Sequence, residues 1–161
     1  MRGARLFLIV LLLSGGGKCA AQGIGIIGIN LVTDPSGIAL TGSGTTAAVM
    51  SLGTVQAYGG TVPTGVTKNL NATSFTLNTI VDLQVTFLGI LSPSYTLTAQ
   101  LLTTDVINTW KINSKTLSTT ATTITSSGAY GTTPVNFALT VPFSEAAGTF
   151  ANTIEFIVTS N

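Results

Sequence analysis

The stretch 81-VDLQVTFLG-89 alternates apolar and polar residues along most of its length. Every second residue from Val81 to Phe87 is apolar, so these side chains lie on one side of an extended chain and the polar ones lie on the other. A period of two indicates a half-buried β-strand, whereas a helix would need apolar residues three and four positions apart. The stretch therefore predicts a sheet with one face toward a core.

The same alternation recurs at 95–101, 135–141 and 154–158. Serine and proline residues at 91–94 favour a turn, so we expect 81–89 and 95–101 to form a hairpin. Weaker strand patterns lie at 48–58, 68–78, 109–115 and 122–128. Together these segments make roughly eight to ten short strands, and the fold class they predict is all-β, an Ig-like antiparallel β-sandwich.

The first 21 residues have the pattern of a cleavable secretory signal peptide. Arg2 and Arg5 precede an unbroken apolar run at 6–13, and Cys19 and Ala21 are small residues at positions −3 and −1 of a cleavage site. The run is much shorter than the roughly 20 residues of a membrane span. We expect a secreted protein that is not inserted in a membrane after cleavage, divided into signal peptide 1–21, N-terminal extended segment 22–34 and sandwich domain 35–161.

Charged residues are few in the chain that would remain after cleavage. Three lysines stand against five carboxylates, whereas a soluble surface usually carries about 25–35% charged residues. There is no basic patch for nucleic acid and no basic amphipathic helix for a membrane surface. Two interpretations stay open: an uncharged extracellular domain, or a subunit whose surface is covered by copies of itself.

Side chains that carry catalysis or bind metals are scarce. The sequence has no histidine, and its one cysteine lies in the predicted signal peptide, so the commonest general base and the thiolate nucleophile are missing. We expect Asp82 and Glu155 to face solvent, and Asp34 and Asp105 to form turns. The sequence therefore predicts a protein that is not an enzyme and that binds no cofactor or metal.

The segment 23-GIGIIGIN-30 spaces its glycines as in the dinucleotide-binding motif G-x-G-x-x-G. That motif needs a strand before it, a helix after it and an acidic residue about 20 positions further on, and the sequence provides none of them. The segment is instead an apolar extended stretch near the predicted new amino terminus. Its large aliphatic residues, with the leucine that follows, are Ile24, Ile26, Ile27, Ile29 and Leu31.

These five aliphatic side chains need to be buried, because an exposed apolar strand promotes aggregation. They can form the first strand of the chain's own sandwich, where the change of phase after Ile26 indicates a bulge or burial on both faces. They can also insert into an open groove of a neighbouring copy, which is β-strand addition. In the second case the five residues are the contact between subunits.

The stretch 141-VPFSEAAGTFANTIEFIVTSN-161 places Gly148, Thr149 and Phe150 at a corner before an alternating last strand. It resembles the closing strands of secreted bacterial pilin-like and spore-coat-U-like β-sandwich subunits, and 95–101 is similar to one of their middle strands. The resemblance implies an immunoglobulin-like sandwich that polymerises into surface fibres or coats by strand exchange. The cysteine pair common in chaperone-assembled pilins is missing here.

The aromatic residues are the basis for an alternative prediction of function. We expect Trp110, which alternates with Ile112, to pack in the core with its N–H bonded locally. Tyr58 and Tyr130 each precede a glycine, and two loop tyrosines can form a contact patch. The function predicted is a structural subunit of an extracellular filament, pilus or coat whose partners are copies of itself. The alternative is a monomeric binding module or adhesin that recognises a surface glycan or protein.

Overall fold

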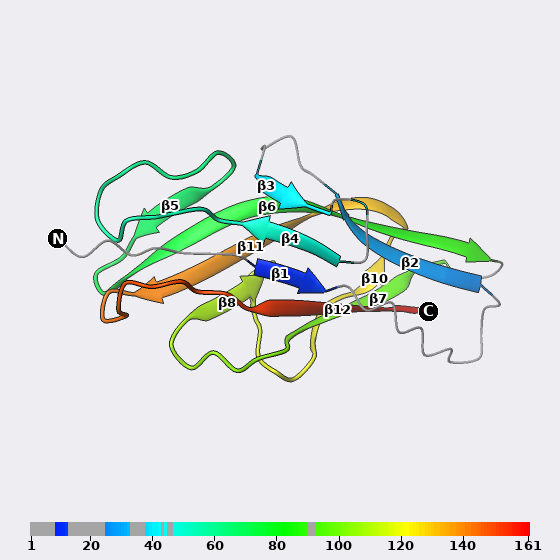
Figure 1. Ribbon diagram of the computed structural model, residues 1–161. Coiled ribbons are helices and arrows are strands. Elements are labelled where there is room, and N and C mark those ends of the chain that lie inside the picture. Colours follow the sequence, from blue (N-terminus) through cyan, green and yellow to red (C-terminus); the bar gives the residue numbers. More distant parts are fainter. Residues whose placement is uncertain (1–8, 13–24, 33–37, 43, 45–46, 90–92) are drawn as a thin grey trace.

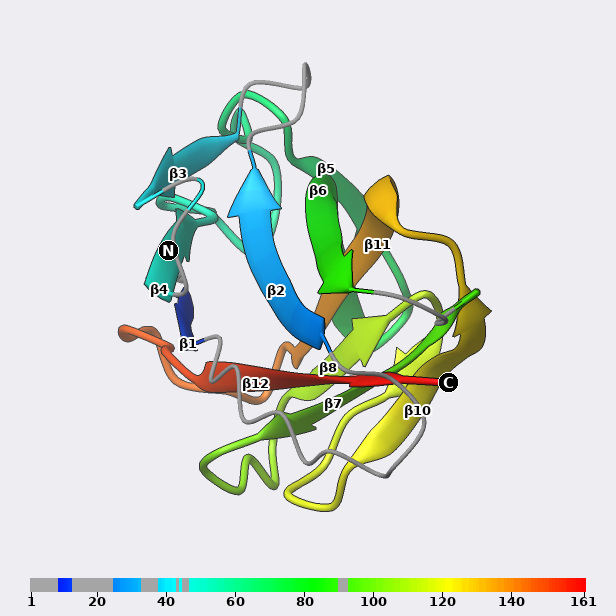
Figure 2. The ribbon, with the colours of Figure 1, turned by 90° about the vertical axis from the view of Figure 1, so that its right-hand side faces the viewer.

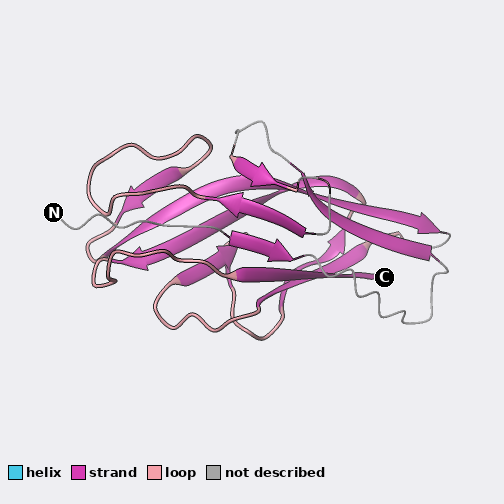
Figure 3. Ribbon diagram, in the orientation of Figure 1, coloured by secondary structure: helices cyan, strands magenta, loops and turns pink. Residues whose placement is uncertain are grey.

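The computed structural model describes residues 9–12, 25–32, 38–42, 44, 47–89 and 93–161. Every regular element in these residues is a β-strand (Figure 3), which confirms the all-β prediction. No helix in the described part of the chain is long and apolar enough to cross a membrane. The strands are β1 (Ile9–Leu12), β2 (Gly25–Val32), β3 (Ala39–Thr41), β4 (Ala47–Ser51), β5 (Thr67–Leu70), β6 (Ser74–Gly89), β7 (Tyr95–Leu101), β8 (Thr109–Ile112), β9 (Lys115–Thr116), β10 (Thr122–Gly128), β11 (Gly131–Pro142) and β12 (Thr153–Ser160).

The strands form two six-stranded sheets around one core. One sheet has the order β10-β7-β12-β1-β4-β3, and the other has the order β2-β6-β11-β8-β9 with β5 also paired to β6. Figure 2 shows β12 and β7 on one side of the interior, with β6 and β11 on the other. Both sheets contribute to the core, because Leu83 and Leu139 of one sheet and Leu97 and Phe156 of the other are buried. The β-sandwich is confirmed, and its Ig-like character stays a prediction.

The alternating stretches fold as their periodicity predicts. In β7 and β12 every second side chain is buried, beginning with Tyr95 and Ile154 respectively, and the residues between them are half-buried. In β6 the residues Val81, Leu83 and Val85 are buried. The weaker patterns at 68–78 and 109–115 each contain the end of one strand and the start of the next, because turns interrupt them.

The predicted hairpin of β6 with β7 is wrong. The two strands are consecutive in the chain but belong to different sheets. One edge of β6 is paired with β11, and the other is paired with β5 near its start and β2 near its end. The turn residues at 91–94 indicate a change of direction, but they do not specify whether the next strand pairs with the last.

Gly128, at the end of β10, lies against the ring of Tyr95. A Cβ at this position would be 2.2 Å from Cζ of Tyr95, so either the buried ring of Tyr95 or the backbone at residue 128 would have to shift. We expect Gly128→Ala to lower the free energy of unfolding by about 1–3 kcal/mol, the usual cost of overpacking, as measured by urea denaturation. Gly148→Ala is the control, because a Cβ there meets nothing closer than 3.9 Å. Equal stability of the two variants would contradict the packing described here.

Candidate subunit interface

The residues predicted to form the donor strand divide into three groups. Ile29 and Leu31 are buried in the chain's own core, with 2% and 0% of their surface exposed. Ile26 and Ile27 belong to β2 by their backbone, and Ile24 lies outside the described residues. In this structure β2 therefore pairs within its own chain, and its last four residues anchor it there. Its register with β6 runs from Gly25 to Val32 without a shift, so the described part of β2 contains no bulge.

The first half of β2 and the end of β6 form a two-stranded ribbon, Gly25–Gly28 paired with Thr86–Gly89. The pairing of β6 with β11 ends at Val85, so within the described residues these last four positions of β6 pair with β2 alone. Figure 1 shows the tips of the two strands reaching furthest toward one end of the molecule. A two-stranded ribbon on its own is only marginally stable, and no third strand of this sheet supports the pairing of these residues within the described part of the chain.

The ribbon presents apolar surface. Leu88, which pairs with Ile26, is 79% exposed. Phe87, which pairs with Ile27, stacks on the ring of Tyr130 with centroids 5.3 Å apart. The Tyr130 hydroxyl in turn donates a hydrogen bond to the carbonyl of Ser94 at 3.0 Å. Tyr130 is thus half-buried at the base of the ribbon and does not meet Tyr58 in a shared patch.

Strand β1 lies within the segment predicted to be the signal peptide. It sits between two strands of its sheet, parallel to β12 and antiparallel to β4, as Figures 1 and 2 also show. In the register, Leu11 lies opposite Ile154 on one side and Ala48 on the other. Both of these neighbours are fully buried. The assignment of residues 1–21 as a cleaved signal stays a prediction, and if it holds, β1 is absent from the mature protein.

Trp110 has the structural role predicted for it. The indole is 1% exposed, and its Nε1–H donates to Oδ2 of Asp105 at 2.7 Å. Asp105 also accepts hydrogen bonds from the backbone N–H groups of Ile107 and Asn108. Burial acts to raise the pKa of Asp105, but these bonds outweigh it and hold the pKa below its ordinary value of 3.8. Asp105 is therefore a turn former, as predicted, and its carboxylate is fully engaged in structure.

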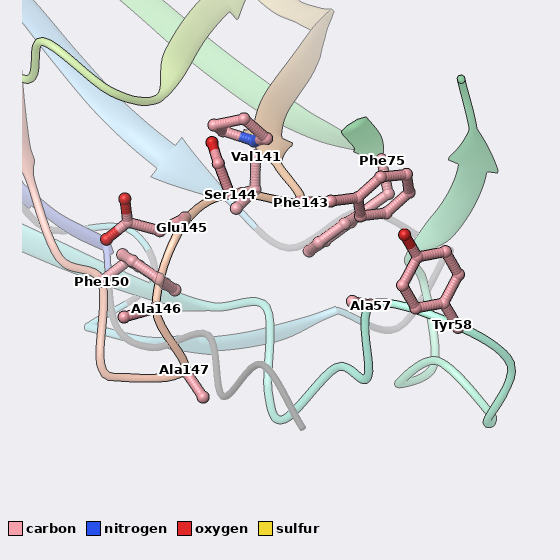
Figure 4. A pocket seen from close by; sticks show the side chains of 11 residues that line it. Ala57, Tyr58, Phe75, Val141, Phe143, Ser144, Glu145, Ala146, Ala147 and Phe150 are labelled. Atoms are coloured by element: carbon pink, nitrogen blue, oxygen red, sulfur yellow. The ribbon is translucent and has the colours of Figure 1, made fainter. Parts of the chain in front are cut away.

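A pocket of about 410 Å³ opens beside the turn after β11. Figure 4 shows Tyr58, Phe75 and Phe143 on one side of it and Glu145 and Phe150 on the other. The rings of Tyr58 and Phe143 are stacked with centroids 4.4 Å apart, and Tyr58 is 65% exposed. Aromatic rings beside one carboxylate are the chemistry that a sugar-binding site uses, so this pocket is the observation that favours the alternative function.

The carboxylates do not gather into a site in the described residues. Asp82 and Glu155 are half-buried, each between buried neighbours of its strand, and Gln100 donates to Glu155 at 2.7 Å. Asp34 lies outside the described residues. Over the part of the chain that the structure describes, no group of three or more histidine, cysteine, aspartate or glutamate residues is placed to hold a metal ion.

Two features of the strand arrangement were not predicted from the sequence, namely the ribbon and the position of β1. Predicting the ribbon would have required knowing that the pairing of β11 with β6 ends at Val85 of β6. Predicting the position of β1 would have required asking which strands the apolar run at 6–13 can pair with. Compared with family models and with curated proteins, the chain matches none.

Proposed function

We propose that the chain is a secreted structural subunit of an extracellular filament, pilus or coat, located outside the cell or on its surface. Copies of the chain associate through β-strand addition of the N-terminal apolar segment, and the protein is neither an enzyme nor a cofactor carrier. The observation that carries the proposal is the ribbon, in which, over the residues that the structure describes, the end of β6 pairs with the start of β2 alone.

Because of the ribbon, the donor chain loses few of its own contacts when its N-terminal strand is added to a second copy. Its four residues of β2 leave only four backbone positions of β6 unpaired when they detach. Leu88, on the strand left behind, is already 79% exposed, so little apolar surface is newly exposed there. Ile29 and Leu31 stay in the core and keep the detached N-terminal residues attached to their own subunit. The intermolecular contact then belongs to Ile24, Ile26 and Ile27.

The surface outside the ribbon also suits a protein covered by its own copies. After signal cleavage only eight side chains carry a full charge, three lysines and five carboxylates. Leu102, Val106 and Ile107, on the loop between β7 and β8, expose between 49% and 88% of their surface. Exposed apolar side chains mark an interaction site where they form a contiguous patch, so this loop is a candidate for a further contact between copies.

The test is to compare the secreted protein with its Ile26→Asp variant. A buried isoleucine contributes roughly 1.5–3 kcal/mol to a contact, and an unpaired carboxylate in its place costs several kcal/mol more. We expect the variant to fold with an unchanged circular dichroism spectrum but to form no filaments in negative-stain electron microscopy and no pellet on ultracentrifugation. Ile80→Asp is the matched control, because Ile80 is 42% exposed on β6 outside the ribbon, and it should assemble as the wild type does.

Two results would contradict the proposal. If Ile26→Asp assembles like the wild type, strand addition by this segment is wrong. If the wild-type protein stays monomeric and is retained on a glycan or protein ligand, the binding module is the better interpretation, and the pocket beside Tyr58 is then the first place to examine.

A further inference from the structure

We propose that removal of residues 1–21 opens a slot one strand wide between β4 and β12, and that this slot receives the N-terminal arm, residues 23–28, of a second copy. The inference rests on the proposed function and names the acceptor that the proposed function lacks. It also gives the predicted signal peptide a role before cleavage. Its strand β1 fills the slot, so the unprocessed chain cannot accept the strand of a second copy there.

The slot follows from the order of the sheet. β1 is the only described element that joins the group β10-β7-β12 to the pair β4-β3. Without β1, the edges of β4 and β12 that faced it have unpaired N–H and C=O groups. Such groups are costly to leave buried without a partner, and an open sheet edge is a template for a strand from another chain.

The floor of the slot is apolar. Ala48 and Met50 of β4 and Ile154 and Phe156 of β12 are each no more than 1% exposed in the intact sheet. The register sets Ile9 opposite Met50 and Leu11 opposite Ala48. The slot therefore requires a strand of about four residues with apolar residues two positions apart, because alternate residues of a strand share one face.

The N-terminal arm meets these requirements by its sequence. Ile24 and Ile26 are two positions apart, with Gly25 between them. When this pair takes the places of Ile9 and Leu11, Gly25 takes the place of Val10, opposite Val49 of β4. The glycine brings no side chain to the outer face of the sheet at that point.

The position of the ribbon indicates a second copy as the source of the arm. β1 pairs with Thr153–Glu155 at the start of β12, whereas Figure 1 shows the ribbon tip and the other end of β12 at the same end of the molecule. From Glu155 to Ser160 a strand advances about 16 Å at roughly 3.3 Å per residue. The arm of one copy thus leaves at one end, and the slot of the next lies toward the other. A head-to-tail contact of this kind produces an open filament when the rotation between successive copies does not close a ring.

Paired cysteines test the contact, because the chain's one native cysteine, Cys19, is lost with the predicted signal peptide. In the secreted protein carrying Gly25→Cys and Val49→Cys, we expect mild oxidation of the assembled material to give a ladder of covalent multimers on a non-reducing gel. Each single variant should give nothing larger than a dimer. The protein carrying Gly25→Cys and Gly89→Cys is the matched control, because these two residues pair in the register of β2 with β6.

The outcomes separate this inference from the proposed function. Assembly with a ladder only in the Gly25→Cys, Val49→Cys protein supports the slot. Assembly with a ladder only in the Gly25→Cys, Gly89→Cys protein shows that the arm pairs with β6 of the neighbour, which overturns the slot and leaves strand addition standing. Assembly with no ladder in either protein, or a Gly25→Cys, Val49→Cys disulfide within one monomer, also overturns the slot. No assembly of the wild-type protein overturns both proposals.

Discussion

Replacing Ile29 with aspartate is expected to unfold the chain. Ile29, in the second half of β2, is buried in the core with 2% of its surface exposed. Loss of a buried aliphatic side chain alone costs about 2–5 kcal/mol, and a carboxylate left there without a partner adds several kcal/mol. The sum is comparable with the whole stability of a typical domain, about 5–15 kcal/mol. Thermal denaturation followed by circular dichroism should show no cooperative transition for Ile29→Asp.

Two further variants, one at the same position and one in the ribbon, make this result specific. Ile29→Val keeps the shape of the side chain and should cost only about 0.5–1.5 kcal/mol. Ile26→Asp, in the ribbon, should remain folded. If Ile29→Asp retains the melting temperature of the wild type, Ile29 is not in its own core, and the whole of β2 rather than its first half then belongs to a neighbouring subunit.

Replacing Asp105 with alanine is expected to cost about 2–4 kcal/mol of unfolding free energy. The change removes the acceptor of the Trp110 indole N–H, which is then buried without a partner, and each such group costs about 1–3 kcal/mol. It also releases the N–H groups of Ile107 and Asn108 from the turn. Urea denaturation at neutral pH measures the loss. Asp82→Ala, at a half-buried position of β6, should change the stability by no more than about 0.5 kcal/mol.

The same carboxylate makes stability depend on pH. Because the pKa of Asp105 is lower in the folded chain than its ordinary value of 3.8, the ionised form favours folding. This contribution is fully present above that value and is lost as the pH falls below it through the folded pKa. Denaturation between neutral pH and pH about 2 should therefore show a steeper acid loss for the wild type than for Asp105→Ala. Parallel profiles would contradict the role assigned to Asp105.

Periodicity predicted the strands well because it reports burial directly. β6, β7, β11 and β12 each have one face in the core, and their sequences alternate accordingly. The alternation of apolar residues does not show which strands pair with one another. The hairpin expected at 91–94 failed because β6 already has a partner along each edge, and those partners come from distant parts of the sequence.

The candidate interface was predicted in part for a similar reason. Five aliphatic residues within eight positions indicated burial, but not that Ile29 and Leu31 are fixed in the core while the residues before them lie in a ribbon. The prediction that Trp110 packs in the core with its N–H bonded locally is confirmed, because a buried indole N–H needs an acceptor and Asp105 is only five residues away. The place of β1 was not predicted, because an apolar run after two arginines matches a signal peptide without reference to the sheet.

Sedimentation velocity of the wild-type protein recovered from outside the producing cell tests the central claim most directly. A subunit that assembles by strand addition should sediment as large species of many chains. These species should persist on dilution, because an inserted strand leaves only when its backbone pairing is broken. A single species with the mass of one chain at every concentration would contradict the account.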